Sequence, residues 1–319
     1  MTVLVGIDEA GFGPILGPLV VSSSALRLPE KLLDADLWEV LRKSVSKTRR
    51  HPAGRLLVAD SKKVYSRSRG IGQLRRSVLT FMNCLGSRPR TLNQLLSFLS
   101  CDCLERLPDY PWYENTDKYR IETNDMDISI AGNVLKKDLA SNNIKLVELK
   151  SRCIDVGRYN QMVNTTGNKS SVLFSTAAAL IQKAWDSFAG EGLQIIIDRH
   201  GGRVRYGRIL QRAFGALDLT ILRESKVVSS YLLCDKDRYM KLHFVTKGDE
   251  KYLTTALASM VSKFVRELLI DNINCYFRSF HKDLKATAGY YQDGRRFIRD
   301  LQSKTPRIEY DKNKLIRCR

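Results

Sequence analysis

The sequence predicts an α/β fold in which a central sheet is flanked by helices. Two apolar runs, residues 3–7 and 193–197, are typical of buried strands, and each is followed by an acidic residue and then glycines. Two longer segments, residues 173–188 and 256–269, repeat apolar side chains at helical spacing. Strands that alternate with such helices build a sheet whose faces the helices cover.

The first apolar run leads into the stretch around which the chain is organised. Asp8 and Glu9 stand at its end, and Gly11, Gly13 and Gly17 follow. Carboxylates at the end of a buried strand are costly to desolvate unless a cation is near, and glycines let backbone amides approach a ligand closely. A metal ion beside a phosphate would explain both features. The alternative is a strand that ends in solvated acids and continues into a hairpin.

Residues 6–14, GIDEAGFGP, and residues 17–21, GPLVV, resemble the opening signature of the type 2 ribonuclease H family. That signature is G-I-D-E-A-G-R-G-P, two residues, then G-P and small apolar residues. Phe12 departs from it, because the family has Arg or Lys at this position. The resemblance implies a ribonuclease H-like fold with a central mixed sheet, and it covers a core made of residues 1–83 and 151–300.

Residues 60–63, DSKK, follow a short apolar run at residues 56–59. They resemble the second signature of the family, whose lysine faces the nucleic-acid backbone, which implies that Lys62 and Lys63 bind substrate. An Asp-Ser pair before two lysines is also a good helix cap, so the stretch alone leaves both interpretations open.

The remaining segments are predicted in less detail. Residues 37–45 are expected to form a short helix and residues 47–55 a basic loop. Residues 84–150 fit the family poorly and are expected to form an insertion or small subdomain that includes a helix and then a strand at residues 145–149. The other expected elements are, in chain order, a helix that follows Asn168 and buries Trp185, strands at residues 219–222 and 239–246, and a basic C-terminal tail at residues 301–319.

Four carboxylates come from three separate places in the chain: Asp8 and Glu9, Asp198 after the second apolar run, and Asp249 before the long helix. Converging like charges raise one another's pKa values, and divalent cations relieve the repulsion. Hard oxygen ligands suit Mg²⁺ or Mn²⁺, and two such ions can clamp a scissile phosphate. Neighbours in a strand point to opposite faces, so Asp8 and Glu9 reach one site only if the strand ends or bulges there.

The second half of the chain carries further features of the family. The family has a catalytic Asp just before a helix with the pattern S-x-x-x-K-x-x-R-D, and Ser259, Lys263, Arg266 and Glu267 occupy comparable positions, with Glu in place of the last Asp. Gly289 and Tyr290 resemble a later G-Y element, which implies that Tyr290 contacts the substrate. His200, two residues after Asp198, either assists proton transfer or is an ordinary loop histidine.

The charge of the chain is strongly positive and uneven. The formal net charge is +19, and residues 42–90 contain 14 Lys or Arg residues against a single acid, Asp60. Residues 102–127 hold eight acids and three bases. Concentrated positive charge favours a polyanion, and without an amphipathic membrane helix the expected partner is nucleic acid rather than a membrane. A merely solvated basic surface is the alternative.

Several protein classes lack support in this sequence. It contains no G-x-x-x-x-G-K-S/T loop, no H-E-x-x-H, no paired C-x-x-C elements and no G-x-S-x-G elbow. Its seven cysteines are odd in number and scattered, and no signal peptide or membrane span is expected, which favours a reducing, cytoplasmic location.

These features together predict a nuclease that depends on two Mg²⁺ or Mn²⁺ ions, and the resemblance to type 2 ribonucleases H implies an endoribonuclease that cleaves the RNA strand of an RNA–DNA hybrid. Asp8, Glu9, Asp198 and Asp249 are the expected catalytic and metal-binding residues, and the resemblance adds Gly11, Phe12, Gly13, Lys62, Lys63 and Tyr290 as substrate contacts. The alternatives are a nuclease of the same fold with a different nucleic-acid substrate, and a non-catalytic nucleic-acid-binding protein. Because Phe lacks the charge and donors of Arg, Phe12 is expected to weaken discrimination for a single ribonucleotide embedded in DNA.

Overall fold

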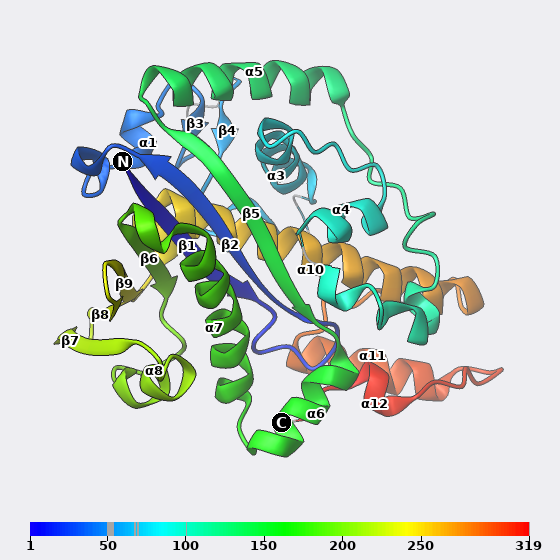
Figure 1. The fold of residues 1–319 in the computed structure, drawn as a ribbon. Helices are drawn as coiled ribbons and strands as arrows, with labels where there is room; N and C mark the ends of the chain where they lie inside the picture. Colours follow the sequence, from blue (N-terminus) through cyan, green and yellow to red (C-terminus); the bar gives the residue numbers. More distant parts are fainter. Residues whose placement is uncertain (50–53, 67, 69, 100, 319) are drawn as a thin grey trace.

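A seven-stranded mixed sheet forms the centre of the molecule (Figure 1). The computed structural model describes all of the chain except residues 50–53, 67, 69, 100 and 319. The strands of the sheet are β1 (Thr2–Ala10), β2 (Leu19–Leu28), β5 (Lys145–Ile154), β6 (Leu193–Asp198), β7 (Asp218–Glu224), β8 (Val228–Asp235) and β9 (Arg238–Val245). They lie in the order β5-β2-β1-β6-β9-β8-β7. The predicted α/β class, with a central mixed sheet flanked by helices, is confirmed.

β1 is the hub of this sheet. It pairs antiparallel with β2, from Thr2 opposite Leu28 to Ala10 opposite Val20, and parallel with β6, whose last paired residue is Ile197. β6 pairs in parallel with β9, and the remaining neighbours are antiparallel. The carboxyl ends of β1, β6 and β9 therefore lie at one edge of the sheet.

Helices cover both faces of the sheet, and side chains alternate between them along β1. Val3, Val5 and Ile7 enter one buried cluster, whereas Leu4 enters the other. The first cluster is closed by α7 (Lys169–Phe188) and α8 (Gly207–Ala213), and it includes Trp185, which is buried as predicted. The second is closed mainly by α10 (Leu253–Phe280).

The long helix α10 crosses β1 at very close range. A Cβ atom on Gly6 would lie 2.2 Å from the backbone of Thr254, so only glycine permits this approach. Ser24 of β2 also donates a hydrogen bond to the Thr254 carbonyl oxygen over 2.8 Å. The first turns of α10 are therefore held against the sheet beside the end of β1, which prepares the site described below.

Residues 84–150 pack on the α10 face and share its buried cluster. β5 begins at Lys145, inside the expected insertion, and pairs with β2 as an edge strand of the central sheet, so the expected boundary at residue 150 falls inside a strand. The division into a core and an insertion remains a prediction. The helices of this region and the one before it are α3 (Gly72–Cys84), α4 (Leu92–Leu99), η2 (Cys101–Cys103), η3 (Leu107–Asp109), η4 (Pro111–Tyr113) and α5 (Asp125–Ser141).

The end of the chain is folded against the start. After α11 (Tyr291–Ser303) and α12 (Lys312–Leu315), Ile316 forms an antiparallel bridge with Leu16, and the Arg317 amide donates to the Ile15 carbonyl oxygen over 2.9 Å. The segment expected to be a basic tail is thus an ordered part of the molecule through residue 318.

The other elements are short, apart from α6. Residues 37–45 contain a single helical turn and then a strand residue, whereas the expectation was one helix. The expected loop at residues 47–55 lies partly outside the described residues, and β8 was not predicted. No helix in the described ranges is long and apolar enough to cross a membrane. These elements are η1 (Glu30–Leu32), α1 (Leu37–Val40), β3 (Val45–Ser46), β4 (Leu56–Leu57), α2 (Ser61–Val64), α6 (Val156–Thr166), η5 (Ala189–Glu191) and α9 (Gly248–Lys251).

Candidate active site

Three of the four predicted carboxylates stand at neighbouring positions along one edge of the sheet. Asp8 lies near the end of β1, and Asp198 is the last residue of the parallel neighbour β6. Because Ile7 is paired with Ile197, Asp8 and Asp198 lie on adjacent strands, which run about 4.8 Å apart. Asp249 is brought to Asp198 by the turn after β9, where the Gly248 amide donates to Asp198 Oδ1 over 2.7 Å.

Glu9 joins this group by a route that the sequence did not predict. The pairing of β1 with β2 is unbroken from Thr2 to Ala10, so the strand neither ends nor bulges at Glu9. Glu9 nevertheless lies beside the other acids: its amide donates a hydrogen bond to Asp8 Oδ1 over 2.7 Å, and burial and Asp198 raise its pKa. The pairing of β1 with β6 stops at Ile7 and Ile197, so Asp8 and Glu9 extend beyond it on the side where β6 ends in Asp198.

Burial and mutual repulsion raise the pKa values of all four carboxylates. Burial raises the pKa of Asp8 well above its ordinary value, and Glu9 and Asp198 raise it further. Burial and Asp198 raise the pKa of Glu9 to about 7, and burial and the nearby Asp60 raise that of Asp249 to about 6. The pKa of Asp198 is raised by burial, although amide hydrogen bonds oppose the change. Uncompensated negative charge in a buried position has this electrostatic signature.

A fifth acid, Asp60, lies close enough to raise the pKa values of Asp198 and Asp249. It caps α2 by accepting a hydrogen bond from the Lys62 amide over 2.9 Å. Asp60 was not among the predicted site residues, although its place in the DSKK stretch was the available signal. Lys62 is exposed and lowers the pKa values of Glu9, Asp198 and Asp249, so the structure brings it to the carboxylates. Lys63 points to Glu250, with Nζ 2.8 Å from Oε1.

Serine side chains of α10 fix the position of this edge, and only Ser259 had been noted. The Ser259 hydroxyl donates to Ser61 of α2 over 3.1 Å, and a hydrogen bond with Ser259 lowers the pKa of Asp8. Ser262 donates to the backbone oxygen of Asp8 over 3.0 Å and lies 2.8 Å from the Ser22 hydroxyl of β2. α10 therefore orients both β1 and α2 around the carboxylates.

The glycine-rich turn after β1 is held by residues from the far end of the chain. Gly11 has a φ of 96°, and a Cβ atom there would lie 2.7 Å from Arg266 Nε, so a side chain is excluded. Arg317 Nε donates to the Gly17 carbonyl oxygen over 2.7 Å, and its Nη1 donates to the Gly11 carbonyl oxygen. Nothing in the sequence pointed to Arg317, because the contact joins residues 306 positions apart.

Phe12 and Gly13 lie on the outer side of this turn. Phe12 is partly buried against the cluster under α7, and Lys169 Nζ lies 5.3 Å from the centre of its ring. The ring thus packs inward while an exposed cation of α7 stays beside it. Gly13 is exposed and has open space where a Cβ would be.

Tyr290 is half-exposed and stands beside the buried charges of α10. Lys263 Nζ lies 5.7 Å and Arg266 Cζ 5.6 Å from the centre of its ring. Both cations are paired with Glu267, Lys263 at 2.6 Å and Arg266 at 3.3 Å. The side chains of the predicted α10 pattern therefore lie against Tyr290 and the Gly11 turn.

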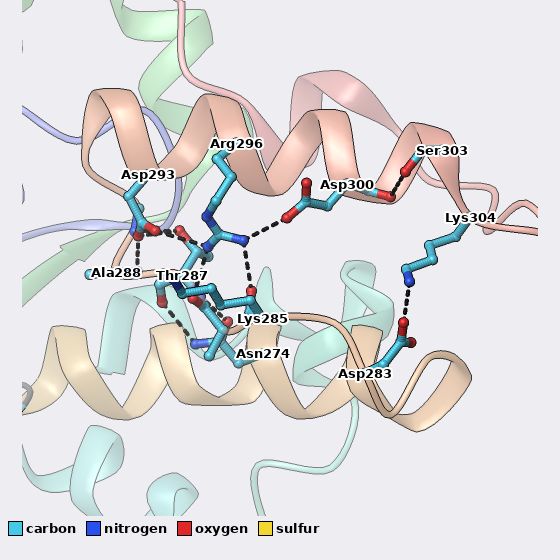
Figure 2. A network of polar contacts seen from close by, with 12 residues as sticks. Asn274, Asp283, Lys285, Thr287, Ala288, Asp293, Arg296, Asp300, Ser303 and Lys304 are labelled. Atoms are coloured by element: carbon cyan, nitrogen blue, oxygen red, sulfur yellow. Dashed lines mark hydrogen bonds and ion pairs between the residues drawn. The ribbon is translucent and has the colours of Figure 1, made fainter.

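A polar network fixes the loop that carries Tyr290 (Figure 2). Asn274 of α10 is bonded to both backbone groups of Thr287, whose hydroxyl donates to Asp293 over 2.8 Å. Arg296 then bridges Asp293 and Asp300 and donates to two loop carbonyl oxygens. The same loop supports the glycine turn, because the Gly289 oxygen accepts from the Ile15 amide over 2.8 Å.

His200 is enclosed rather than open to the site. Phe174, Tyr206 and Phe244 surround its ring, and burial lowers the pKa of His200 to about 4. A buried, neutral histidine of this kind fits the structural interpretation better than proton transfer.

The predicted metal ligands were tested against this geometry. Within the described part of the chain, no group of three or more His, Cys, Asp or Glu side chains is arranged as a metal site. The donor set nonetheless consists of carboxylate oxygens with raised pKa values, which is the chemistry that a hard divalent cation would neutralise. The residues fit such an ion by chemistry, and their side chains would have to converge further to form a complete ligand shell.

The basic stretch at residues 42–90 is partly neutralised by the acidic stretch at residues 102–127. Arg75 pairs with Glu122 at 3.3 Å, Arg76 with Asp127 at 2.6 Å, and Arg90 also pairs with Asp125. These ion pairs reduce the positive charge that the three arginines present to a ligand, and the expectation that residues 42–90 supply nucleic-acid affinity stays a prediction. Arg50, Arg67 and Arg69 belong to the same stretch and lie outside the described residues.

Comparisons with known proteins were made against this fold. Neither the family profiles nor the curated protein sequences contain a match to this chain. Among solved structures, it is similar to the ribonuclease HII of Archaeoglobus fulgidus in its complex with PCNA, with 18% identity, 99% of this chain and 94% of that chain covered, and a TM-score of 0.48. It is also similar to the ribonuclease H2 of Pyrococcus horikoshii, with 16% identity, 92% and 83% coverage, and a TM-score of 0.44.

A third similar structure is that of the Bst ribonuclease HIII in complex with Mn²⁺. The identity is 15%, this chain is covered over 93% of its length and that chain over 62%, and the TM-score is 0.43. All three are ribonucleases H, the class of protein that the opening signature resembles.

Proposed function

We propose that this chain is a metal-dependent endoribonuclease that cleaves the RNA strand of RNA–DNA hybrids and leaves a 3′-hydroxyl and a 5′-phosphate. The observation that carries the proposal is the mutual influence of Asp8, Glu9, Asp198 and Asp249, whose pKa values are all raised at one edge of the sheet. A protein that only binds nucleic acid would gain nothing from burying four like charges.

Divalent cations would be held by Asp8, Glu9, Asp198 and Asp249, with Asp60 near enough to add to the negative potential. When bound, Mg²⁺ or Mn²⁺ supplies an activated water and stabilises the leaving oxygen. The chain itself contributes orientation, because Ser259 and Ser262 hold the end of β1 and the Asp8 carboxyl in place. Lys62 offers an exposed cation for a phosphate at the edge of the site.

The substrate class rests on the resemblance of residues 6–14 to the opening signature of type 2 ribonucleases H. Arg266, Arg317 and Gly289 constrain the backbone of the Gly11–Gly13 turn. The turn therefore offers a rigid surface for a ribose to bind. A nuclease of the same fold with another substrate shares every contact of the carboxylates, so the choice of substrate needs its own measurement.

Replacing a central carboxylate tests the proposal directly. Asp8→Asn and Asp198→Asn should each lower the rate of hybrid cleavage in Mg²⁺ or Mn²⁺ by at least about 100-fold, because each removes charge where the metal is expected. The dissociation constant for the hybrid should change by less than about threefold, since nucleic-acid affinity comes mostly from Lys and Arg contacts to phosphate. Gel-based cleavage and fluorescence anisotropy measure the two quantities.

The control is Asp237→Asn, which removes an exposed carboxylate in the turn between β8 and β9. It should leave cleavage unchanged. Assays on hybrid, duplex DNA, duplex RNA and single strands separate the substrates. Cleavage of another nucleic acid in preference to the hybrid would overturn the substrate assignment, and full activity of Asp8→Asn would overturn the catalytic one.

A further inference from the structure

Exposed cations gather on the helix and strand that follow Asp198 in the chain. Residues 203–226 contain six basic residues against two acids, Asp218 and Glu224. Five of the cations are exposed, and we call these five the α8–β7 surface: Arg205, Arg208, Arg212, Arg223 and Lys226. Residues 42–90 were predicted to provide nucleic-acid affinity, and no such role was predicted for residues 203–226.

These cations are largely uncompensated by the protein. Among the described residues, the side chains of Arg208, Arg212, Arg223 and Lys226 make no ion pair or hydrogen bond, and Arg205 reaches Glu224 only at 3.9 Å while 90% exposed. Arg75, Arg76 and Arg90 show the opposite pattern, because acids of the neighbouring segment form ion pairs with them. The cations of the α8–β7 surface are therefore accessible to a ligand in solution, whereas the paired arginines are engaged in ion pairs within the protein.

The α8–β7 surface is continuous with the candidate active site. The turn between β7 and β8 is bonded to the loop after Asp198 through Arg199, whose guanidinium donates to the Lys226 oxygen over 2.6 Å and to the Ser225 oxygen over 2.8 Å. It is bonded to the loop before Asp249 through Thr246, whose amide donates to the Val227 oxygen over 3.0 Å. Lys226 thus stands at the same edge of the sheet as the carboxylates.

The elements that carry these cations are anchored to the sheet. Tyr206, just before α8, stacks on Phe244 of β9 with ring centres 3.6 Å apart, and its amide donates a hydrogen bond to the Tyr231 hydroxyl over 2.8 Å. α8 then packs on β7, where a Cβ on Gly207 would touch Ile221 at 3.4 Å. Figure 1 shows α8 and β7 together at the end of the sheet that follows β6, β9 and β8, and away from α5.

We propose that the α8–β7 surface binds the sugar–phosphate backbone of a nucleic acid and guides it to the carboxylate edge, an inference that rests on the proposed function. Exposed arginines match phosphate oxygens by charge and by paired donors. Such contacts add affinity without sequence preference and make it depend on salt. An acidic protein is the competing partner, and the experiment separates the two.

The test combines Arg208→Gln, Arg212→Gln, Arg223→Gln and Lys226→Gln in an Asp8→Asn background. Because Asp8→Asn should not cleave, the nucleic-acid probe stays intact during the titration. Anisotropy titrations of a 20-base-pair RNA–DNA hybrid and of duplex DNA are run from 50 to 300 mM salt. Each lost phosphate contact lowers the log–log salt slope by roughly 0.9 on duplex DNA, so the slope should fall by about 2–4. The matched control, Lys136→Gln with Lys137→Gln on the exposed face of α5, should leave it unchanged.

Replacing the three arginines by Lys keeps the charge and should keep most of the slope. An unchanged slope in the four-residue variant overturns the inference, as does loss of binding to polyglutamate with hybrid binding intact. A natural protein that cleaves the hybrid while the slope is unchanged refutes this inference alone. A natural protein that binds with the expected slope but cuts nothing refutes the proposed function alone.

Discussion

At the scale of single residues, the candidate site consists of carboxylates whose pKa values are raised by the fold, so that they ionise less readily than exposed carboxylates. Asp8 and Glu9 are neighbours whose charges repel each other, and Asp8 Oδ1 accepts a hydrogen bond from the Glu9 amide over 2.7 Å. Burial raises both pKa values, and Asp198 adds repulsion. Two neighbouring acids that repel each other strongly titrate as a pair, so replacing either one changes the titration of the other.

This arrangement predicts a pH dependence of stability for the metal-free protein. The pKa of Glu9 rises from its ordinary value of 4.5 to about 7 on folding, so between these pH values the folded chain holds a proton that the unfolded chain has released. The free energy of unfolding should therefore fall as the pH rises from about 4.5 to 7, by an amount of order 1–3 kcal/mol. Urea unfolding in EDTA at several pH values measures it.

Glu9→Gln should flatten this profile, whereas Glu105→Gln, which removes an exposed acid between η2 and η3, should not. Adding Mg²⁺ at pH 7 should raise the free energy of unfolding of the natural protein, because a ligand that binds only the folded state stabilises it. Parallel profiles for Glu9→Gln and the natural protein would contradict this account of the site.

At the scale of elements, the glycine turn after β1 depends on two segments from the end of the chain. The loop before α11 contributes the Gly289 carbonyl oxygen, and the segment after α12 contributes Arg317. Arg317 is buried, and burial together with Arg266 lowers the pKa of Arg317 to about 9. In this buried position the Arg317 guanidinium donates hydrogen bonds to the backbone oxygens of Gly11 and Gly17, which offset part of the cost of burying the cation.

Arg317→Met should lower the free energy of unfolding by about 2–4 kcal/mol, since two backbone oxygens lose a buried donor. It should also reduce hybrid cleavage through the disturbed turn. Arg317→Lys keeps the charge but not the paired donors, and it should recover only part of the stability. Urea midpoints measure the effect, with Arg307→Met, an exposed residue before α12, as the control. Equal midpoints for Arg317→Met and the control would remove Arg317 from the support of the turn.

At the scale of the whole molecule, the basic and acidic stretches of the sequence neutralise each other across the α10 face. Arg76 of α3 donates to both carboxylate oxygens of Asp127 on α5, over 2.6 and 3.0 Å, and to the oxygens of Arg55 and Gly54. The net charge of +19 is therefore distributed differently in space than along the chain. Arg76 joins elements rather than offering charge to a ligand.

Arg76→Gln should accordingly lower the free energy of unfolding by about 1–2 kcal/mol, because a partly buried, bidentate pair and two backbone contacts are lost. The salt slope of nucleic-acid binding should stay the same. Lys43→Gln removes an exposed charge from the same stretch and should leave stability unchanged. A salt slope that falls by about 0.9 in Arg76→Gln, with stability retained, would restore Arg76 as a phosphate contact.

The sequence by itself determined the features that depend on neighbouring residues. The apolar runs became β1 and β6, and the helical spacing became α7 and α10. Asp198 ends β6 as expected, whereas β1 continues past Asp8 and Glu9 to Ala10. Each of these follows from hydrophobic periodicity and from the glycines that end a strand, so a short window contains the whole signal.

Only the tertiary structure decided how distant residues combine. The capture of the Gly11 turn by Arg317, the approach of Asp60 to Asp249, the pairing of Arg76 with Asp127 and the open charge of the α8–β7 surface join segments far apart in the chain. Such contacts depend on the order of the strands and on which helix covers which face. Whether a charge serves the fold or a ligand follows from those distances, and no local pattern of residue types encodes them.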